Sequence, residues 1–316
     1  MTSDPVDDAT LALLLEVAGT PKPGNVDRHR DLDDLRFEAF LGGAVGAREG
    51  LELAADGETG IGRAFERGVS GMAARAGTNT QFGCLLLLVP LVRASVGDDE
   101  DDANLFPASV DRVTRETTVD DAVAFYRAFD HVDVAVGDPP TDADALDVRR
   151  GSDATPALRE REVTLRDVMA LSAEPADPDH ADDPDRIPDR NAQEWAEGFP
   201  RTFRAAEWIQ SDEGPMTDRA ARAFLGLLAA ESDTLIAANH GPETAREASE
   251  RAGALLGGDR STSGNIDATA VHDADRDAAE ELAAAFVDEG INPGTTADLT
   301  CAALYVALRH GTVVSP

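Results

Sequence analysis

A single lysine is the residue whose chemistry stands out most in this sequence. Lys22 lies in the segment TPKPGNVD, residues 20–27, and the other 27 positively charged side chains are all arginine. Its ammonium is a compact charge with three donors, which suits phosphate oxygens. Pro21 and Pro23 restrict the backbone and Gly24 permits a sharp turn, so the segment should be rigid and non-helical. We expect a fixed anion-binding lysine; the alternative is an ordinary turn with a solvated lysine at its tip.

Two further junctions have a similar composition. They are GTNTQFG, residues 77–83, and NPGTTAD, residues 292–298. Both place small hydroxyl, amide and glycine residues where a helix should begin, and the free N–H groups of a first helical turn attract anions. Ordinary helix capping is the alternative, and Thr295 with Asp298 has the spacing of a capping box. Three such junctions beside one lysine predict a polyphosphate held among helix ends. The candidate ligand-binding residues are Glu16, Thr20, Gly24, Asn25, Thr78, Asn79, Thr80, Asp233, Asn292, Gly294 and Thr295.

Four carboxylates lie in or beside these segments. Glu16 precedes the lysine segment, Asp27 ends it, Asp233 opens DTLIAANHG, and Asp298 ends the third junction. Mg²⁺ is usually bound by one or two carboxylates together with phosphate oxygens. We therefore take Asp27 and Asp298 as candidate metal ligands and, with Lys22, as candidate catalytic residues. Which carboxylate is a base and which binds metal stays open at this point.

The charge balance excludes some classes of protein. The 316 residues include 61 acidic and 28 basic side chains, a net charge of −33 and a pI near 4.3. Nucleic acids and anionic membranes need a basic surface, so neither is an expected partner. Abundant Asp with almost no Lys is typical of a protein adapted to a cytosol of concentrated salt, where charge repulsion is screened. A local basic pocket for an anionic substrate would stand out against this background.

Cysteine usage and hydropathy indicate a soluble cytoplasmic protein. Cys84 and Cys301 are too few and too far apart for a disulfide framework, and we expect two free buried thiols. The start of the chain is polar and acidic, unlike a signal peptide, and the longest apolar run, residues 84–92, is too short to span a bilayer. Small-molecule substrates are the expected partners, and the oligomeric state is left open.

The elements that position these residues should be helices almost throughout. Apolar periodicity predicts helices over 5–19, about 35–55, 60–76 and 81–95, of which the fourth is apolar on nearly every side and should be central. Glycines in the second helix, Gly42, Gly43 and Gly46, should allow another helix to approach closely. Further helices are predicted over 119–129, 164–171, 191–210, 218–231, 243–256, 270–289 and 297–309.

The remaining segments complete the fold prediction. An acidic loop is expected at 97–104, an exposed insertion rich in Pro and Asp at 173–190, and a strand-like run at 131–136. The sequence has no βαβ alternation and no repeat. We predict an all-α fold: a single compact multi-helix domain over residues 1–316 with acidic surface loops.

Four motifs together resemble the triphosphoribosyl-dephospho-CoA synthase family. They are EVxxTPKPGxVD at 16–27, GxNTxxG at 77–83, DTxxxxxxG at 233–241 and NPGxxADL at 292–299, in the family's order. The resemblance implies an all-helical enzyme that breaks the N-glycosidic bond of ATP and transfers the 5-triphosphoribosyl group to the 2′-hydroxyl of 3′-dephospho-CoA, releasing adenine, with Mg²⁺ on the triphosphate. Lys22 and the threonine-rich helix starts would then hold phosphates, and Asp27, Asp298 or Glu16 would serve as base or metal ligand.

Two positions depart from the bacterial pattern of that family. Gln81 and Phe82 stand where, in the bacterial enzymes, a His-Lys pair follows the Asn-Thr of the second motif, so the chain looks more like an archaeal branch. ATP as donor is thus better supported than dephospho-CoA as acceptor. Two alternatives follow: the same transfer to a different acceptor in a cofactor pathway, and a non-catalytic nucleotide-binding helical protein.

Overall fold

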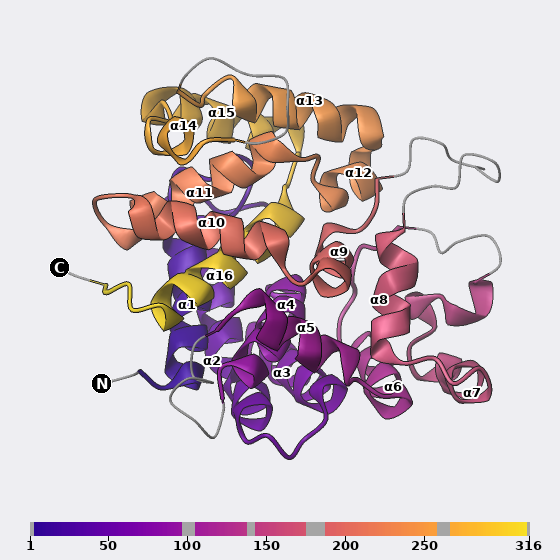
Figure 1. The fold of residues 1–316 in the computed structure, drawn as a ribbon. Coiled ribbons are helices and arrows are strands. Elements are labelled where there is room, and N and C mark those ends of the chain that lie inside the picture. Colours follow the sequence, from indigo (N-terminus) through magenta and orange to yellow (C-terminus); the bar gives the residue numbers. More distant parts are fainter. Residues whose placement is uncertain (1–2, 97–104, 138–142, 175–186, 258–265, 315–316) are drawn as a thin grey trace.

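The computed structural model describes residues 3–96, 105–137, 143–174, 187–257 and 266–314 (Figure 1). Within these ranges the chain is all-α, as predicted, and it forms no β-strand. The helices are α1 (Pro5–Ala18), α2 (Phe37–Ala55), α3 (Ile61–Ala76), α4 (Phe82–Ala94), α5 (Pro107–Arg115), α6 (Val119–Ala128), η1 (Asp144–Leu146), η2 (Val148–Ala154), α7 (Thr155–Glu160), α8 (Leu165–Ala173), α9 (Arg190–Glu197), α10 (Pro200–Ser211), α11 (Met216–Ala230), α12 (Thr234–His240), α13 (Pro242–Gly253), α14 (Ala268–His272), α15 (Arg276–Glu289) and α16 (Gly294–Arg309).

Two apolar helices form the centre of the molecule. Nearly all of α4 is buried, as its apolar sequence predicts, and most of α16 is buried with it. The two helices contact each other, and α1 and α10 pack against α16 as well. Because α16 starts within the third junction and α1 leads into the lysine segment, this core brings two of the predicted motifs together.

A close crossing of α2 and α3 confirms the role expected for Gly46, one of the three glycines named above, and adds Gly50. A Cβ atom on Gly46 would lie 2.3 Å from the carbonyl oxygen of Gly71, and one on Gly50 would lie 2.3 Å from the nitrogen of Gly68. Neither Gly46 nor Gly50 can carry a side chain while the two backbones are this close. The crossing fixes the α2–α3 pair, on which α4 packs.

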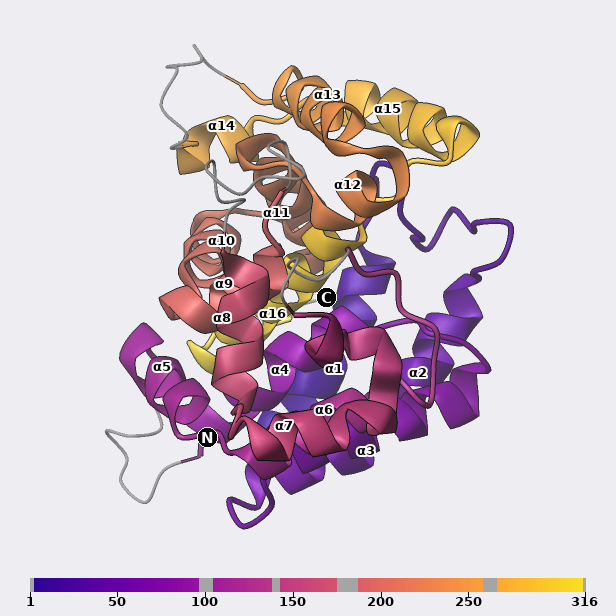
Figure 2. The same ribbon diagram turned by 90° about the vertical axis from the view of Figure 1, so that its right-hand side faces the viewer.

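A smaller apolar cluster holds the C-terminal helices together. It includes Phe224 on α11, Ile236 on α12, Ala248 on α13 and Phe286 on α15. Two views at right angles place α13, α14 and α15 at one end of the molecule and α3 and α6 at the other (Figures 1 and 2). The first turns of α16 contribute to this cluster and also to the larger core, so the start of α16 lies between the two.

Two predicted helices are wrong because each is two helices in the structure. The segment 191–210 breaks between α9 and α10, where Gly198 and Phe199 have φ of 82° and 64° and Pro200 begins the second helix. The segment 270–289 breaks between α14 and α15, where Asp275 caps the second helix. At the first break the positive φ angles of Gly198 and Phe199 redirect the chain, and α10 packs against α16.

Three other predicted segments have different outcomes. The strand-like run 131–136 pairs with no strand in the described ranges, so that prediction is wrong. The acidic loop at 97–104 and most of the insertion at 173–190 lie outside the described residues. No helix in the part of the chain that the structure describes has the length and hydropathy needed to cross a membrane.

Candidate functional site

The lysine segment folds inward, so its ammonium group does not project into solvent. Lys22 is fully buried, and its Nζ forms an ion pair with Glu16 near the end of α1. The same Nζ donates to the side-chain oxygen of Asn25 at 3.1 Å and lies 5.9 Å from the centre of the Phe224 ring. Two of its three donors are therefore engaged by the protein itself, and a solvated lysine at the tip of a turn is excluded.

Asp27 holds the lysine segment in shape. One carboxylate oxygen accepts from the hydroxyl of Thr20 at 2.9 Å, from the backbone N–H of Lys22 at 3.3 Å and from Arg30 at 3.0 Å. The other accepts from the backbone N–H of His29 at 2.8 Å. Both oxygens of this fully buried carboxylate thus have partners within the same stretch of chain.

The lysine segment docks onto the junction that leads into α16. Asn25 donates through Nδ2 to the side-chain oxygen of Asn292 at 3.0 Å. Gly24 has φ of 69°, and a Cβ atom there would lie 1.9 Å from the carbonyl oxygen of Ile291. A glycine is required at this position both by its backbone conformation and by the close approach. The first and last motifs, far apart in the sequence, are therefore in direct contact.

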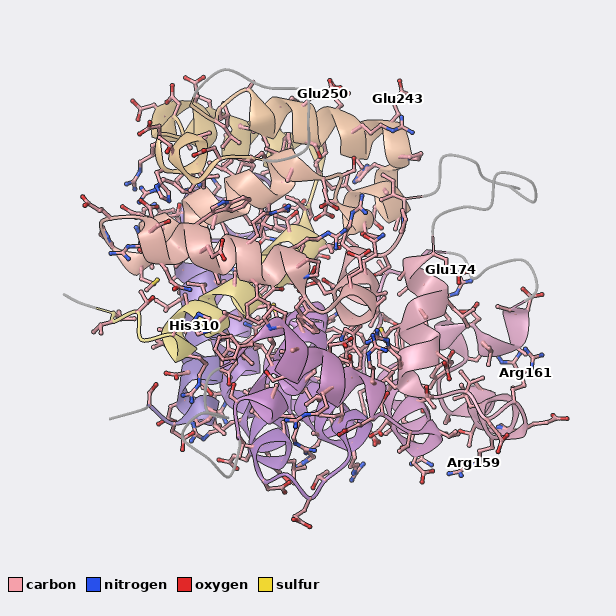
Figure 3. All side chains as sticks on the ribbon, in the orientation of Figure 1. Arg159, Arg161, Glu174, Glu243, Glu250 and His310 are labelled. Atoms are coloured by element: carbon pink, nitrogen blue, oxygen red, sulfur yellow. The ribbon has the colours of Figure 1, made fainter. Side chains whose placement is uncertain are left out.

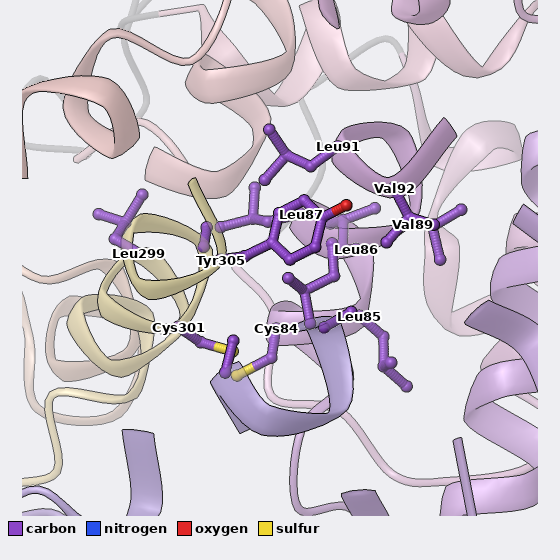
Figure 4. Packing of buried hydrophobic residues seen from close by; sticks show 14 of the residues in the cluster. Cys84, Leu85, Leu86, Leu87, Val89, Leu91, Val92, Leu299, Cys301 and Tyr305 are labelled. Atoms are coloured by element: carbon purple, nitrogen blue, oxygen red, sulfur yellow. The ribbon is translucent and has the colours of Figure 1, made fainter. Parts of the chain in front are cut away.

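Asp298 lies where α4, α9 and α16 meet. One of its carboxylate oxygens accepts from Nδ2 of Asn191 on α9 at 2.9 Å, and the other accepts from the thiol of Cys84 on α4 at 3.3 Å. A Cβ atom on Gly83 would lie 1.9 Å from Oδ2 of Asp298, so the glycine that ends the second motif makes room for this carboxylate. In Figure 4 the side chain of Cys84 approaches that of Cys301, which lies about one turn beyond Asp298 on α16.

Burial governs the charge of this cluster. It raises the pKa of Asp298 to about 7, and the negative charges of Glu16 and Asp233 add to the rise, while the hydrogen bonds that Asp298 accepts oppose it. Burial also raises the pKa of Glu16, and its pairing with Lys22 opposes that rise. Among these three acidic residues Asp298 alone keeps part of its surface exposed. Glu16 and Asp233 are buried.

Asp233 accepts hydrogen bonds from the first turn of α16. Its Oδ2 accepts from both the backbone N–H and the hydroxyl of Thr296 at 2.7 Å, and its Oδ1 caps α12 through the N–H groups of Leu235 and Ile236. Burial raises the pKa of this carboxyl, and these hydrogen bonds oppose the rise. Gly294 begins α16 in close contact with α12, because a Cβ atom there would lie 2.5 Å from Leu235. Asp233, the first residue of the DTxxxxxxG motif, thus hydrogen-bonds to the first turn of α16, the helix that begins in the NPGxxADL motif.

The polar residues of the second junction mainly build the fold. The side-chain oxygen of Asn79 accepts from the backbone N–H of Phe82 at 3.2 Å, and its amide donates to the backbone carbonyl of Asp133 at 3.3 Å. Thr78 is exposed, and Thr80 packs against α2. In the described part of the chain no hydrogen bond joins these three polar residues to the lysine segment. The junction contacts Asp298 through Gly83, its last residue, and through Cys84, which follows it.

The two positions that depart from the bacterial pattern are core residues here. Phe82 packs among Phe65, Phe125 and Phe129, with ring centroids 4.9–6.4 Å from its own. The amide nitrogen of Gln81 donates to a backbone carbonyl oxygen of α1 at 3.4 Å. Neither side chain presents a charge to the site.

Sequence reasoning missed the residues that α9 and α10 supply. Asn191, which donates to Asp298, lies outside the four motifs. The same is true of Arg190, Arg201 and Arg204, which line a small pocket beside the first turn of α16. The spacing of two arginines on one face of α10 was a usable signal. Their position beside α16, however, depends on the change of chain direction before α10.

The described residues offer no ready-made metal centre. They contain no group of three or more His, Cys, Asp or Glu side chains arranged to hold a metal ion. Asp27 and Asp298 both accept hydrogen bonds at each carboxylate oxygen, and of these two predicted metal ligands only Asp298 has part of its surface exposed. A metal here would need most of its ligands from a substrate and from water, as phosphate-bound Mg²⁺ does.

Comparisons with known proteins agree with the motifs. The family model described as ATP:dephospho-CoA triphosphoribosyl transferase matches residues 2–314. The crystal structure of a candidate triphosphoribosyl-dephospho-CoA synthase from Archaeoglobus fulgidus has a similar fold, with a TM-score of 0.61 and 23% sequence identity over 87% of this chain and 99% of that one. No curated protein matches the chain.

Proposed function

The chain belongs to the ATP:dephospho-CoA triphosphoribosyl transferase family, and from this premise we propose that Asp298 is the base of the transfer reaction. The family's activity makes the protein a transferase that moves the triphosphoribosyl group of ATP to dephospho-CoA. That transfer needs a group that binds the donor, a group that accepts a proton, and a frame that holds both.

The chemistry sets the requirements for the base. The bond between C1′ of the ATP ribose and the adenine nitrogen breaks, and adenine leaves with the bonding electron pair and takes up a proton at that nitrogen. A bond forms between C1′ and the 2′-hydroxyl oxygen of dephospho-CoA, whose proton must be removed. A carboxylate near the reacting hydroxyl can accept that proton, and a base is most effective when its pKa lies near the working pH.

Asp298 meets these requirements better than the other carboxylates. Its pKa is raised to about 7, and part of its surface is exposed at the place where α4, α9 and α16 meet. Glu16 forms a buried ion pair with Lys22, and Asp27 accepts hydrogen bonds from within the lysine segment. The proposal rests on this one partly exposed acidic residue with a near-neutral pKa.

The lysine segment then acts as support for the site. Lys22 neutralises Glu16 and orients Asn25, which in turn holds Asn292 at the junction before α16. A buried ion pair with additional hydrogen bonds can hold its partners in one geometry. We assign Lys22 the role of fixing the start of α16, and through it the position of Asp298.

ATP would enter the site as its magnesium complex. Mg²⁺ keeps several waters and is usually bound through substrate phosphates and at most two carboxylates. Asp298 could supply one carboxylate, but a carboxylate bound to a cation is a poor base. We therefore assign Asp298 the role of proton acceptor. Mg²⁺ would be bound by the phosphates of ATP and by water, since the described ranges contain no group of three acidic side chains that could hold it.

The charge of the chain bears on where it works and on its partners. A net charge of −33 supports a cytoplasm of concentrated salt as its location, because salt screens the repulsion between acidic side chains. The same charge argues against nucleic acid as a partner. Assays of this protein should therefore be run in concentrated KCl.

Adenine release tests the proposed function. Purified protein in concentrated KCl should release adenine from MgATP only when dephospho-CoA is present. Asp298→Asn should lower kcat by about 10²–10⁴-fold, the usual contribution of a general base, while ATP affinity stays within about twofold. Because the base must be deprotonated, wild-type kcat should rise with pH through about 7.

A matched control comes from the surface of α15. Asp288 is exposed, and Asp288→Asn should leave kcat unchanged. If Asp298→Asn keeps more than about a tenth of wild-type kcat, well above the range expected for loss of a general base, Asp298 is not the base. Adenine released only with another acceptor would instead support a different transfer, and no adenine under any condition would support a nucleotide-binding protein.

A further inference from the structure

Three arginines gather at one pocket in a chain dominated by acidic residues. Arg190 begins α9, and Arg201 and Arg204 lie three residues apart on α10. Together with Thr295 and Thr296 of α16 they line a small pocket with about 260 Å³ of space between atoms, its open mouth included. The enclosed part has room for about one water molecule, so a phosphate group would have to enter through the open mouth and displace the side chains that line it.

One glutamate serves as a shared counter-ion for these arginines. The carboxylate of Glu231 lies 2.9 Å from Arg201 and 3.3 Å from Arg190, measured between charged atoms. It lies farther from Arg204, at 3.8 Å, which is beyond hydrogen-bonding distance. A single carboxylate cannot neutralise three guanidinium groups, so the charge of the pocket depends on the other acidic residues around it.

Two of those other acidic residues are counter-ions of Arg201 itself, and a third caps helix starts. Glu194 and Glu197 both pair with Arg201, at 3.3 Å and 2.9 Å. Burial raises the pKa of Glu194, which weakens it as a counter-ion. Asp233 lines the pocket, but its oxygens accept from the starts of α12 and α16. These carboxylates serve Arg201 and the helix starts, and none of them reaches Arg204.

Arg204 is the group with unused donors. Its Nε and Nη2 are inaccessible to solvent and form no hydrogen bond with any described residue, and its guanidinium lies 5.4 Å from the centre of the Trp208 ring. Buried donors without acceptors are rare because each costs free energy. A planar guanidinium held over an aromatic ring is well suited to bind a phosphate through two parallel hydrogen bonds.

We propose that this arginine pocket binds the end of the triphosphate of ATP, with Arg204 as its anchor. The proposal rests on the proposed function for the identity of the ligand, and on the unpaired donors for the site itself. Thr295 at the pocket and Asp298 are three residues apart on α16, so they lie on the same helix face. Phosphates at Arg204 would thus leave the ribose on the side of the pocket that faces Asp298.

Inorganic tripolyphosphate is the direct probe, because its binding requires no turnover. We expect wild-type protein in concentrated KCl to bind tripolyphosphate by calorimetry. Arg204→Met should weaken that binding about tenfold or more through loss of a charge-assisted pair. With MgATP and dephospho-CoA, the KM for ATP should rise by a similar factor while kcat changes much less.

The control removes the same charge elsewhere. Arg161 is exposed beside α7, away from α10 and α16 (Figure 3), so Arg161→Met should bind tripolyphosphate like the wild type. If Arg204→Met fails to fold, Arg204→Lys decides the question. It keeps the charge but loses the planar fork, and it should bind tripolyphosphate more weakly than the wild type.

The outcomes separate the two proposals. Unchanged tripolyphosphate binding in a folded Arg204 variant, or no binding by the wild type, overturns the pocket assignment, whatever the enzyme's activity. Binding that depends on Arg204 in a protein that releases no adenine supports the pocket and overturns the proposed function.

Discussion

The lysine segment and the arginine pocket both hold cationic side chains near the start of α16, yet they differ in how their donors are used. Lys22 is fully buried and bonded to Glu16 and Asn25, whereas Arg204 has two buried donors without a hydrogen-bonding partner among the described residues. The rarest cation of the sequence is therefore paired within the protein, whereas a common one keeps donors without a hydrogen-bonding partner. The rarity of a residue therefore did not identify the position with unpaired donors.

The most severe test of this contrast is to remove the lysine. Lys22→Met leaves the Glu16 charge buried and unpaired, and breaking such a pair costs about 3–5 kcal/mol. Urea denaturation at constant KCl should show that loss in the free energy of unfolding. The double variant Lys22→Met with Glu16→Leu should recover most of it, since it leaves no unpaired charge. A Lys22→Met protein with wild-type stability would show that the ion pair does not hold the segment.

The carboxyl group between the two regions gives the next largest effect. Asp298 has a folded-state pKa of about 7 against an ordinary value of 3.8, so the folded protein holds its proton more tightly than the unfolded chain does. The stability that this group contributes is fully present below about pH 4 and is lost as pH rises through 7.

Asp298→Asn should therefore be more stable than the wild type at pH 8, by at most about 4 kcal/mol, and the gap should close towards pH 4. Thermal unfolding of both proteins across that range measures the difference. Equal stability at pH 8 would contradict the raised pKa.

Two glycines test how tightly the lysine segment is pressed against its neighbour. Gly24 and Gly57 both have positive φ, but a Cβ atom on Gly24 would overlap the carbonyl oxygen of Ile291, whereas one on Gly57 would meet nothing within 4 Å. In both Gly→Ala variants the backbone conformation costs roughly 1–2 kcal/mol. Gly24→Ala should lose about 1–3 kcal/mol more than Gly57→Ala, the usual cost of overpacking, in urea denaturation. Equal losses would mean that the segment is only loosely docked.

The smallest effect on stability is expected in the arginine pocket. Arg204→Met keeps apolar contact with Trp208 and removes donors that have no acceptor, so its free energy of unfolding should stay within about 0.5 kcal/mol of the wild type. Urea denaturation checks this value beside that of Lys22→Met. A loss comparable to that of Lys22→Met would show that Arg204 is structural too, and the contrast between the two regions would disappear.

Much of the fold could be predicted from apolar periodicity, and the contact between the first and last motifs from their shared polar composition. The expected helix over 191–210 failed because the change of direction at Phe199 depends on how α9 and α10 pack, which local propensity does not encode. The same change of direction sets the arginines beside α16. Asn191 and Asp298 come from distant parts of the chain, and Asn191 lies in no motif that could have revealed their hydrogen bond.

The first turn of α16 carries a consequence for the choice of nucleotide. Thr295 and Asp298 are separated by about 4.5 Å along a rigid helix, three residues at roughly 1.5 Å each. A donor gripped by its phosphate end would therefore present its ribose at a depth set by the length of its phosphate tail. Because this spacing is fixed, ADP and AMP bound by their shorter phosphate tails would place the glycosidic bond away from the carboxylate of Asp298.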